Sequence, residues 1–534
     1  MHRRHLLYGG TALLGILPAA QARTQPARQR PNILFCIADD ASWLHFGAYG
    51  CRWVSTPAFD RVAARGVLFE NCYTPNAKSA PSRASLLTGR YPWQLGAAGN
   101  HICRFPEELG VFTEALEAAG YAVAFTGKGW APGDPGMKEG HRRRLTGTPY
   151  QSRKATPPTP EILDNDYAAN FDDFLADRRD PSQPWFFWFG CREPHRRYAY
   201  GSGASEGGRS LDEIDRVPAF WPDNEAVRND LLDYGFEIEH YDRHLGRMLA
   251  RLEELGLLDN TLVIVTSDNG MPFPRGKGTQ YEYAHHLPLA VMWPRGVRNP
   301  GRRETACVSF VDIAPTLLEA AGVDPAACGM QPLAGGSLVP LLEQTDDPHA
   351  ALRGRALLGR ERHDNGRPAD QGYPIRGIVR DGWLYLRNLK PWLLPGGNPE
   401  TGYRDIDSSP TKTSILHLFR TGADRRYYLL SMGPRPAEEL YHVASDPECL
   451  RDRATDPACR ERLLSLRDEL FAALREQGDP RTGDDGDIFD RYPYDKPGKE
   501  RIFERTVSGE IIPWEHSNWV LPTDYEQYEP NNTK

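Results

Sequence analysis

The sequence predicts an α/β fold in which helices sandwich a mostly parallel central sheet, followed by a smaller C-terminal α+β subdomain. Continuously apolar runs of strand length alternate with segments of helical character, as in parallel sheets that are buried on both faces. Polar residues follow four of these runs directly, and the sites of such sheets lie at the carboxyl ends of strands. A chain of 534 residues, 40% of them hydrophobic, can also form a large core.

The elements of the predicted sandwich alternate along the chain. Strands are predicted over 31–38, 121–126, 185–189, 261–266 and 288–293. Helices are predicted over 57–65, 111–119, 224–255 and 312–321. The long helix is amphipathic, with acidic residues early and arginines late, which complements the helix dipole. Gly322 ends the last of these helices.

The character of the sequence changes after the predicted sandwich. Asp381-Gly382 separates the apolar runs 375–380 and 383–387, which predicts a β-hairpin. Leucines recur through 459–477 and predict a helix. We therefore expect a main domain over 23–370 that carries the site, an α+β subdomain over 371–478 and a tail over 479–534 that wraps the surface.

The N-terminus has the layout of a secretory signal peptide over residues 1–22. A basic start precedes the apolar run Leu6–Ala20, and a small-residue cleavage site ends at Ala22. The apolar run is too short to span a membrane. Arg3-Arg4 is compatible with twin-arginine export as well as with the general secretory route. We therefore expect a secreted or periplasmic protein without a membrane span.

The charge balance argues against a general nucleic-acid binder. Lysine and arginine together number 64 against 72 aspartates and glutamates, which gives a net charge of −8. Nucleic-acid-binding domains are usually net basic. A local basic pocket for an anionic substrate is compatible with this balance.

Four polar residues at two strand ends predict a site for a hard cation. Asp39 and Asp40 follow the first strand, and Asp268 and Asn269 follow the strand over 261–266. These side chains offer oxygen ligands, which suit Ca²⁺ or Mg²⁺, and the sequence has no cluster of His or Cys ligands for zinc. Two adjacent carboxylates repel each other unless a cation lies between them.

The segment Lys78–Arg90, KSAPSRASLLTGR, predicts a helix whose start binds an anion or presents a nucleophile. Pro81 suits a first helical turn, and Ser79 is predicted at the N-cap. A group at this end faces the positive pole of the helix dipole. Arg83 lies one turn further along and can contact the same group.

Ser79-Ala-Pro-Ser-Arg83, followed by Leu-Leu-Thr-Gly-Arg90, resembles the signature of the formylglycine-dependent sulfatases. Further segments are similar to that family in the same order: Asn32–Asp40, Gly127–Gly129, Glu193–Arg196, Ser267–Gly270 and Gly276–Thr279. The resemblance covers residues 30–460 and implies the sandwich fold shared by alkaline phosphatases and sulfatases. It also implies that a serine-type maturase oxidises Ser79 to formylglycine.

The same resemblance implies roles for the site residues. It implies one metal ion, calcium ahead of magnesium, bound by Asp39, Asp40, Ser79, Asp268 and Asn269. It implies a catalytic set made of Ser79, Arg83, Lys128, His195 and Lys277. In that family the modified residue supplies the attacking hydroxyl and cationic side chains neutralise the sulfuryl oxygens. His195 is expected to protonate the leaving atom.

Within that family, the segments Asp268–Pro274, Tyr373–Arg376 and Ser409–Thr411 look most like the heparan N-sulfatases and their bacterial relatives. The resemblance therefore implies hydrolysis of a sulfate ester or sulfamate on a sugar of a sulfated polysaccharide. N-sulfoglucosamine and an O-sulfated sugar of an algal, ulvan-like polysaccharide are alternative substrates. A phosphatase or phosphodiesterase that uses unmodified Ser79, and an unmodified protein that only binds sulfated glycans, are more remote hypotheses.

One position departs from the family pattern. The family usually has a histidine two residues after the first lysine, where this chain has Trp130. His101 and His285 are the candidates to replace that histidine in space, and Trp130 is a candidate platform for stacking a sugar ring. The substrate-binding set that we expect is Trp130, His101, Arg362 and His363, the last two because they lie where the domains should meet.

Overall fold

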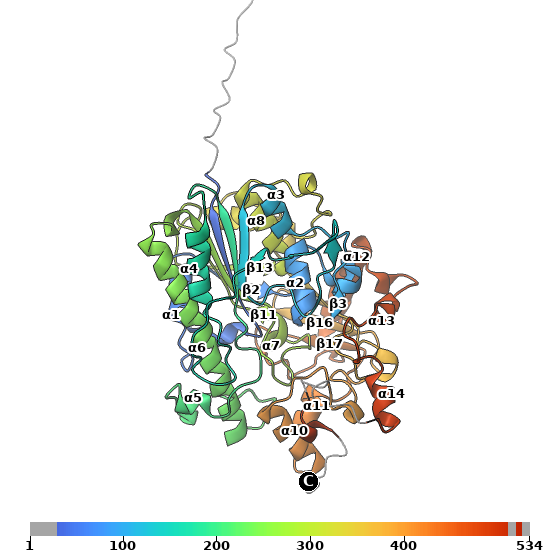
Figure 1. Cartoon of the computed structure of the whole chain (residues 1–534). Coiled ribbons are helices and arrows are strands. Elements are labelled where there is room, and N and C mark those ends of the chain that lie inside the picture. The colour runs from blue at the N-terminus through green and yellow to red at the C-terminus, as the bar shows by residue number, and fades with distance from the viewer. Residues whose placement is uncertain (1–28, 511–519, 526–534) are drawn as a thin grey trace, which may run out of the picture. The chain divides into compact units, whose positions relative to one another are not determined.

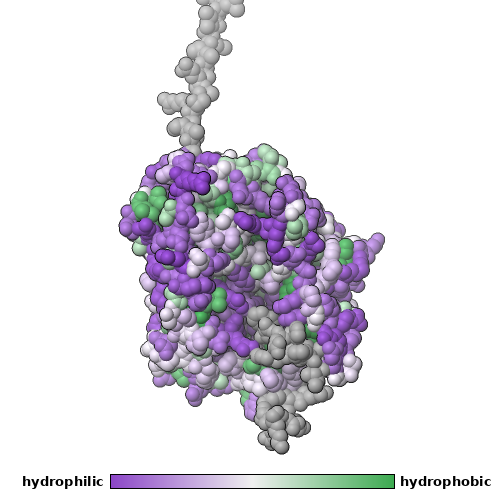
Figure 2. Space-filling model, in the orientation of Figure 1, coloured by the Kyte–Doolittle hydropathy of each residue, from purple (hydrophilic) through white to green (hydrophobic). Residues whose placement is uncertain are grey.

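The computed structural model describes residues 29–510 and 520–525 (Figure 1). The signal peptide predicted over 1–22 and parts of the predicted tail lie outside these residues. No helix within the described ranges combines the length and the apolar character that a membrane crossing requires. The face seen in Figure 2 carries mostly hydrophilic residues, with only small and separate hydrophobic areas.

A nine-stranded mixed sheet forms the centre of the fold. Its strands in spatial order are β11 (His286–Leu287), β2 (Val67–Tyr73), β12 (Leu289–Met292), β10 (Thr261–Ser267), β1 (Asn32–Ala38), β9 (Trp185–Gly190), β4 (Ala122–Gly127) and β8 (Thr148–Pro149), with β13 (Arg302–Ser309) paired to β2. The strands from β10 to β8 are parallel, and β12 and β11 are antiparallel to their neighbours. The predicted mostly parallel α/β sheet is confirmed.

Alternate side chains of β1 belong to two different hydrophobic cores. Leu34 and Cys36 pack in one core, and Ile33 and Phe35 pack in the other. Successive side chains of a strand point to opposite faces, so the sheet is buried on both. The first core includes α1 (Pro57–Ala64), α4 (Tyr167–Asp177) and α6 (Glu225–Glu254), and the second includes α2 (Ser79–Thr88), α3 (Phe112–Ala118) and α8 (Ile313–Ala321) (Figure 1).

The sequence analysis does not predict four strands of the central sheet, namely the two-residue strands β8 and β11 and the longer strands β2 and β13. Glu70 and Asn71 interrupt the apolar run of β2, and charged residues fill the first half of β13. Among the described strands β13 pairs with β2 alone, and its first residues alternate between half-buried and exposed. An edge strand of this kind keeps polar side chains, so its sequence lacks the continuous apolar run of a central strand.

A second, antiparallel sheet forms where the α+β subdomain was expected. Its strands are β14 (Arg355–Arg360), β15 (Ile375–Arg380), β16 (Trp383–Asn388) and β17 (Glu438–Tyr441). Asp381 and Gly382 have φ angles of 51° and 75°, as a two-residue hairpin turn requires. Leucines of α12 (Arg460–Glu476) pack on one face of this sheet. Strand β14 precedes the expected boundary at residue 371, and that boundary stays a prediction.

The remaining short elements lie in the connections. They are α5 (Ser202–Ser205), α7 (Glu282–His285), α9 (Val339–Glu343), α10 (Pro410–Arg420), α11 (Arg426–Ser431), α13 (Ile488–Arg491) and α14 (Ile502–Val507), with the paired strands β3 (Cys103–Arg104) and β5 (Gly133–Asp134), and β6 (Met137–Lys138) and β7 (His141–Arg142). Helices α13 and α14 belong to the segment predicted as a tail.

Arg376 on β15 ties the second sheet to the chain that follows α12. Its side chain is 1% exposed and donates to Asp479 at 2.7 and 2.9 Å and to Glu361 at 2.7 Å. A buried charge is tolerated only with its partners, because nothing else offsets the loss of hydration. This ion-pair network therefore fixes where the segment after α12 begins.

We expect Arg376→Met to lower the free energy of unfolding by about 3–5 kcal/mol, because Asp479 then stays buried without its cation. Arg380→Met on the same strand is the matched control. The Arg380 side chain is 42% exposed and pairs with Glu469, so its loss should cost less than about 1 kcal/mol. Urea unfolding of both variants measures the difference, and equal losses would contradict the assigned role of Arg376.

Candidate active site

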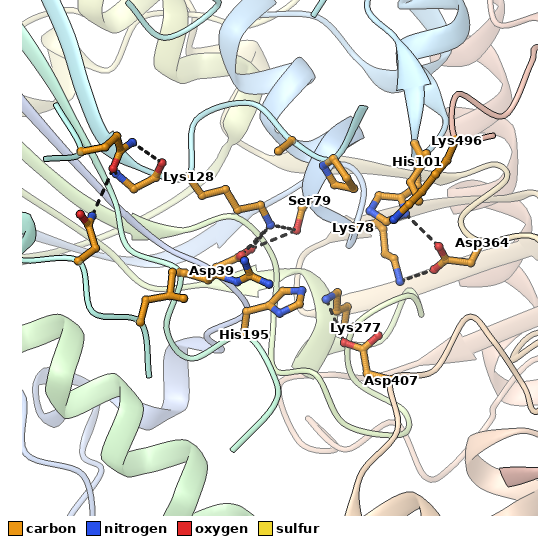
Figure 3. A pocket seen from close by; sticks show the side chains of 18 of the residues that line it. Asp39, Lys78, Ser79, His101, Lys128, His195, Lys277, Asp364, Asp407 and Lys496 are labelled. Carbon is orange, nitrogen blue, oxygen red and sulfur yellow. Dashed lines mark hydrogen bonds and ion pairs between the residues drawn. The ribbon is translucent and has the colours of Figure 1, made fainter. Parts of the chain in front are cut away.

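The carboxyl ends of four neighbouring parallel strands meet at one edge of the central sheet. The strands are adjacent in the order β10, β1, β9, β4. A cavity of about 440 Å³ lies at this edge. Of the expected catalytic residues, it is lined by Ser79, Lys128, His195 and Lys277 (Figure 3). Polar residues that are far apart in the sequence thus face one cavity, as the strand-end argument predicts.

Ser79 occupies the first turn of α2 and not the N-cap. Lys78 is the N-cap residue, and the helix begins at Ser79, so the expected position is wrong by one residue. The Ser79 hydroxyl donates to Asp39 Oδ1 at 3.1 Å and accepts from Lys128 Nζ at 3.1 Å. The side chain therefore lies at the positive end of the helix, between a carboxylate and an ammonium group.

Three buried carboxylates form a cluster beside Ser79. Oxygen atoms of Asp39, Asp40 and Asp268 lie within 4.8 Å of one another, and all three residues are fully buried. Asn269 donates to Asp40 at 2.7 Å through Nδ2. Its Oδ1 is buried and has no hydrogen-bond partner in the described part of the chain. These carboxylate oxygens, together with an amide oxygen that accepts no hydrogen bond, are the ligands that a hard cation such as Ca²⁺ or Mg²⁺ prefers.

The pKa shifts of the clustered carboxylates also favour a bound cation. Burial raises the pKa of Asp40 to about 7, Lys277 opposes this shift, and the neighbouring carboxylate of Asp39 adds to it. Burial alone would also raise the pKa of Asp39, but Lys128 and His195 hold it well below its usual range. Asp40 has a φ of 78°, in the left-handed region that is uncommon for non-glycine residues. The crowded negative charge would be relieved by a cation.

Lys128 and Lys277 bring two ammonium groups to the cluster. Lys128 Nζ donates to both oxygens of Asp39, at 2.8 and 2.6 Å. Lys277 Nζ donates to Asp40 Oδ2 at 2.7 Å and to Asp407 Oδ2 at 3.0 Å. Both lysines also line the cavity, so each can face an anionic group bound there.

Arg83 lies beneath the cluster and does not line the cavity. Its fully buried guanidinium donates through Nε to Asp268 Oδ2 at 2.8 Å. Nη1 donates to the carbonyl oxygens of Lys128 and Gly129, both at 2.9 Å. Nη2 lies 3.4 Å from Asp39 Oδ1, so the guanidinium faces the carboxylate cluster on this side as well. Arg83 therefore supports Asp268 and the loop that carries Lys128, and its expected contact with a bound anion stays a prediction.

His195 lines the cavity from the segment after β9. Its Nδ1 lies 2.8 Å from the carbonyl oxygen of Arg196, so we assign the ring proton to Nδ1. Nε2 lies 4.0 Å from Asp40 Oδ2. Burial and the charge of Lys277 lower the pKa of His195 well below its usual value. Nε2 is therefore the ring nitrogen placed to exchange a proton with a bound group.

Of the four residues expected to bind the sugar, only His101 lines the cavity. Trp130 is 8% exposed and packs edge-on against Phe105 in the core. Its indole N–H donates to the carbonyl oxygen of Ala80 at 3.0 Å. The ring therefore supports the first turn of α2 from below, which corrects the prediction of a stacking platform.

Arg362, His363 and His285 also lie in the interior and not on the cavity wall. Arg362 donates to the carbonyl oxygen of Pro493 at 3.1 Å. His363 Nε2 lies 2.9 Å from Asn76 Oδ1, and His285 Nε2 lies 2.8 Å from the carbonyl oxygen of Gln280. None of these three side chains reaches the cavity, which corrects the expected contacts of Arg362 and His363 with substrate and does not place His285 where the missing histidine would lie.

The cavity wall also contains residues that the sequence analysis did not single out. They are Lys78, Gln151, Lys154, Asp164, Asn165, Arg192, Asp364, Asp407 and Lys496. Most of them lie in loops far from the recognised motifs, so no local pattern marks them. Lys78 and Arg192 are exceptions, because they directly precede Ser79 and the segment Glu193–Arg196. Their positions beside these motifs are the local signal for them in the sequence.

Comparison with known proteins shows the family to which the chain belongs. A family model described as Sulfatase matches residues 31–323. The chain is 29% identical over 497 residues to N-sulphoglucosamine sulphohydrolase from Homo sapiens, with 88% of this chain and 93% of the relative covered. It is 26% identical over 469 residues to an ulvan-active sulfatase from Formosa agariphila, with 84% and 81% covered.

Solved structures show the same fold at lower identity. A protein in complex with its substrate D-glucosamine-2-N,6-O-disulfate matches with a TM-score of 0.58 at 21% identity, covering 84% of this chain and 98% of that chain. A phosphonate monoester hydrolase from Agrobacterium radiobacter matches with a TM-score of 0.57 at 19% identity, covering 84% and 96%. Fold likeness alone therefore does not identify the ester that is cleaved.

We expect Asp268→Asn to weaken binding of a divalent cation by at least about tenfold, because it removes one of three clustered carboxylates. The metal content after dialysis, and the rise in melting temperature on adding Ca²⁺ or Mg²⁺, are the measurements. Asp259→Asn is the matched control, because Asp259 is exposed and pairs only with Arg295 among the described residues. An Asp268→Asn protein that keeps its full cation content would contradict the ligand set.

Proposed function

Because the chain belongs to the sulfatase family, we propose that it hydrolyses a sulfate ester or sulfamate on a sugar of a sulfated polysaccharide or its oligosaccharides. The observation that carries the proposal is the position of Ser79. Its hydroxyl lies 3.1 Å from both Asp39 Oδ1 and Lys128 Nζ, next to the carboxylate cluster and on the wall of the cavity. A sulfate group held by the lysines would present its sulfur to position 79.

Formylglycine at position 79 and a calcium ion in the carboxylate cluster would supply an activated oxygen nucleophile and a Lewis acid. The residues that would hold the ion are Asp39, Asp40, Asp268 and Asn269, together with position 79. Lys128 and Lys277 neutralise the sulfuryl oxygens from the cluster side of the cavity. Because the ring proton of His195 lies on Nδ1, Nε2 would first take up the proton that the attacking hydroxyl at position 79 loses, and would then pass a proton to the leaving oxygen or nitrogen. Arg83 positions Asp268 from beneath.

Two classes of sugar are the first substrates to test. The likeness to N-sulphoglucosamine sulphohydrolase supports N-sulfoglucosamine. The likeness to an ulvan-active sulfatase supports an O-sulfated sugar of an algal polysaccharide. A cavity of about 440 Å³ has the size of a small-ligand site. We therefore propose that the enzyme acts on the end of a sugar chain.

We also propose that the protein is exported and that Ser79 is modified. The signal-peptide layout of residues 1–22 supports a secreted or periplasmic location. The string Ser79-Ala-Pro-Ser-Arg83 supports modification by a serine-type maturase. Intact Ser79 in natively expressed protein would instead favour a glycan-binding protein or a phosphoesterase that uses the serine itself.

We expect the peptide that contains Ser79 to be lighter by two hydrogens in mass spectra of protein co-expressed with a serine-type maturase. Ser79→Ala should lower sulfate release by about 10⁴-fold or more while leaving the fold intact. Ser85→Ala is the matched control in the same helix. The Ser85 hydroxyl is buried without a hydrogen-bond partner in the described chain, so its removal should change neither folding nor turnover. Sulfate release that survives in Ser79→Ala would contradict the mechanism.

We expect sulfate release from either N-sulfoglucosamine or an O-sulfated sugar when both are offered to the matured enzyme. Release from N-sulfoglucosamine alone would make nitrogen the atom that His195 protonates. Release only from an O-sulfated sugar would keep the chemistry and move the substrate to another polysaccharide. Ion chromatography of free sulfate measures both reactions. Failure to release sulfate from any sugar, despite complete modification of Ser79, would contradict the proposed function.

A further inference from the structure

We propose that Lys78 and Lys496 form a second anion-binding subsite in the cavity, which selects sugars that carry another anionic group besides the sulfate to be removed. The inference rests on the proposed function and names the substrate class of the same site. The second group is a sulfate or a carboxylate, which share the chemistry that an ammonium pair recognises.

Lys78 has donors that the described protein atoms do not use. Its side chain is 2% exposed and lies on the cavity wall, where its ammonium pairs with Asp364 Oδ2 at 2.8 Å. An ammonium group has three donors, and Asp364 is its sole side-chain partner among the described residues. By contrast, Lys128 bonds both oxygens of Asp39 as well as Ser79. A buried ammonium with unused donors on a cavity wall calls for a further acceptor.

Asp364 and His101 hold Lys78 in this position. Asp364 is 4% exposed and accepts from His101 Nδ1 and from the Tyr494 hydroxyl, both at 3.3 Å. Burial lowers the pKa of His101 to about 4, despite the opposing charge of Asp364. His101 is therefore neutral at neutral pH, with Nδ1 as the donor to Asp364. The Lys78 ammonium is thus held by the Asp364 carboxylate, which a neutral imidazole and a tyrosine hydroxyl keep in place.

Lys496 adds a positive charge that no carboxylate balances. Among the cationic residues on the wall, Lys154 pairs with Asp164, and Lys277 pairs with Asp407. Lys496 is exposed and has no carboxylate partner within the described residues. Lys499, three residues further on, is 2% exposed, and burial and the charge of Lys496 lower its pKa to about 8. This end of the cavity therefore holds an excess of positive charge.

The subsite lies apart from the groups that would act on the scissile sulfate. Figure 3 shows Lys496, His101 and Asp364 on one side of Ser79, and Lys128 on the other side. A sulfate bound beside Ser79 would interact with Lys128 and Lys277, which leaves Lys78 and Lys496 for a different group. The substrate class that uses both ends of the cavity is a sugar, or a pair of linked sugars, with two anionic groups.

Isothermal titration of the Ser79→Ala protein tests the subsite by binding, without turnover. The probes are N-sulfoglucosamine, glucosamine-2-N,6-O-disulfate, and N-sulfoglucosamine linked to a uronic acid. We expect at least one doubly charged probe to bind about tenfold more tightly than N-sulfoglucosamine, the gain of a charge-assisted hydrogen bond. The probe that shows the gain distinguishes a sulfate from a carboxylate as the second group.

Adding Lys496→Met to this protein should remove the tenfold preference and leave the affinity for N-sulfoglucosamine unchanged. Lys138→Met is the matched control, because Lys138 is exposed and lies outside the cavity. Equal affinities for singly and doubly charged probes, a uniform loss of affinity for all probes in Lys496→Met, or no binding of any probe would each overturn the subsite. Failure of the proposed function is recognised separately, as absence of sulfate release by fully matured wild-type protein.

Discussion

The buried carboxylate cluster at the ends of β1 and β10 is the interaction on which the site depends. Three fully buried carboxylates are costly unless cations offset their charge. Arg83 bonds Asp268, Lys128 bonds Asp39 and Lys277 bonds Asp40. These cations come from helix α2, from the loop after β4 and from the loop after β10. The need to neutralise one cluster therefore brings three distant segments together, and with them the Ser79 side chain.

The central sheet holds this cluster in register. Strand β1 pairs in parallel with β10 from Asn32 opposite Thr261 to Ala38 opposite Ser267, so the residues after both strands emerge side by side. Asp40 then donates its backbone N–H to Asp268 Oδ1 at 3.1 Å. A slip of one residue would exchange the two faces of β1 and expose each set of apolar side chains to the wrong core. The two cores thus fix the register, and the register fixes the ligand geometry.

Local patterns in the sequence predict the parts of the site that follow strands. Asp39, Lys128 and Asp268 lie within two residues of the end of an apolar run, and His195 lies six residues after one, so the strand pattern places all four near one sheet edge. The sequence could not show that Trp130 lies in the core, because an indole suits a buried position with one hydrogen-bond acceptor as well as a sugar platform. It could not show the wall formed by Asp364, Asp407 and Lys496 either. That wall depends on loops whose positions only the tertiary packing defines.

The catalytic side chains and the cavity wall that faces them come from different parts of the chain, yet ion pairs connect them. The reactive side is built from residues up to Lys277, whereas Asp364, Asp407 and Lys496 belong to segments after the central sheet. Asp407 bonds Lys277, which also bonds Asp40 of the cluster. A substitution of Asp407 therefore changes the cavity wall, and it also changes the charge around Lys277, which neutralises the carboxylate cluster. Lys496 has no such link, so the wall can change its selectivity at that position without disturbing the groups that perform the reaction.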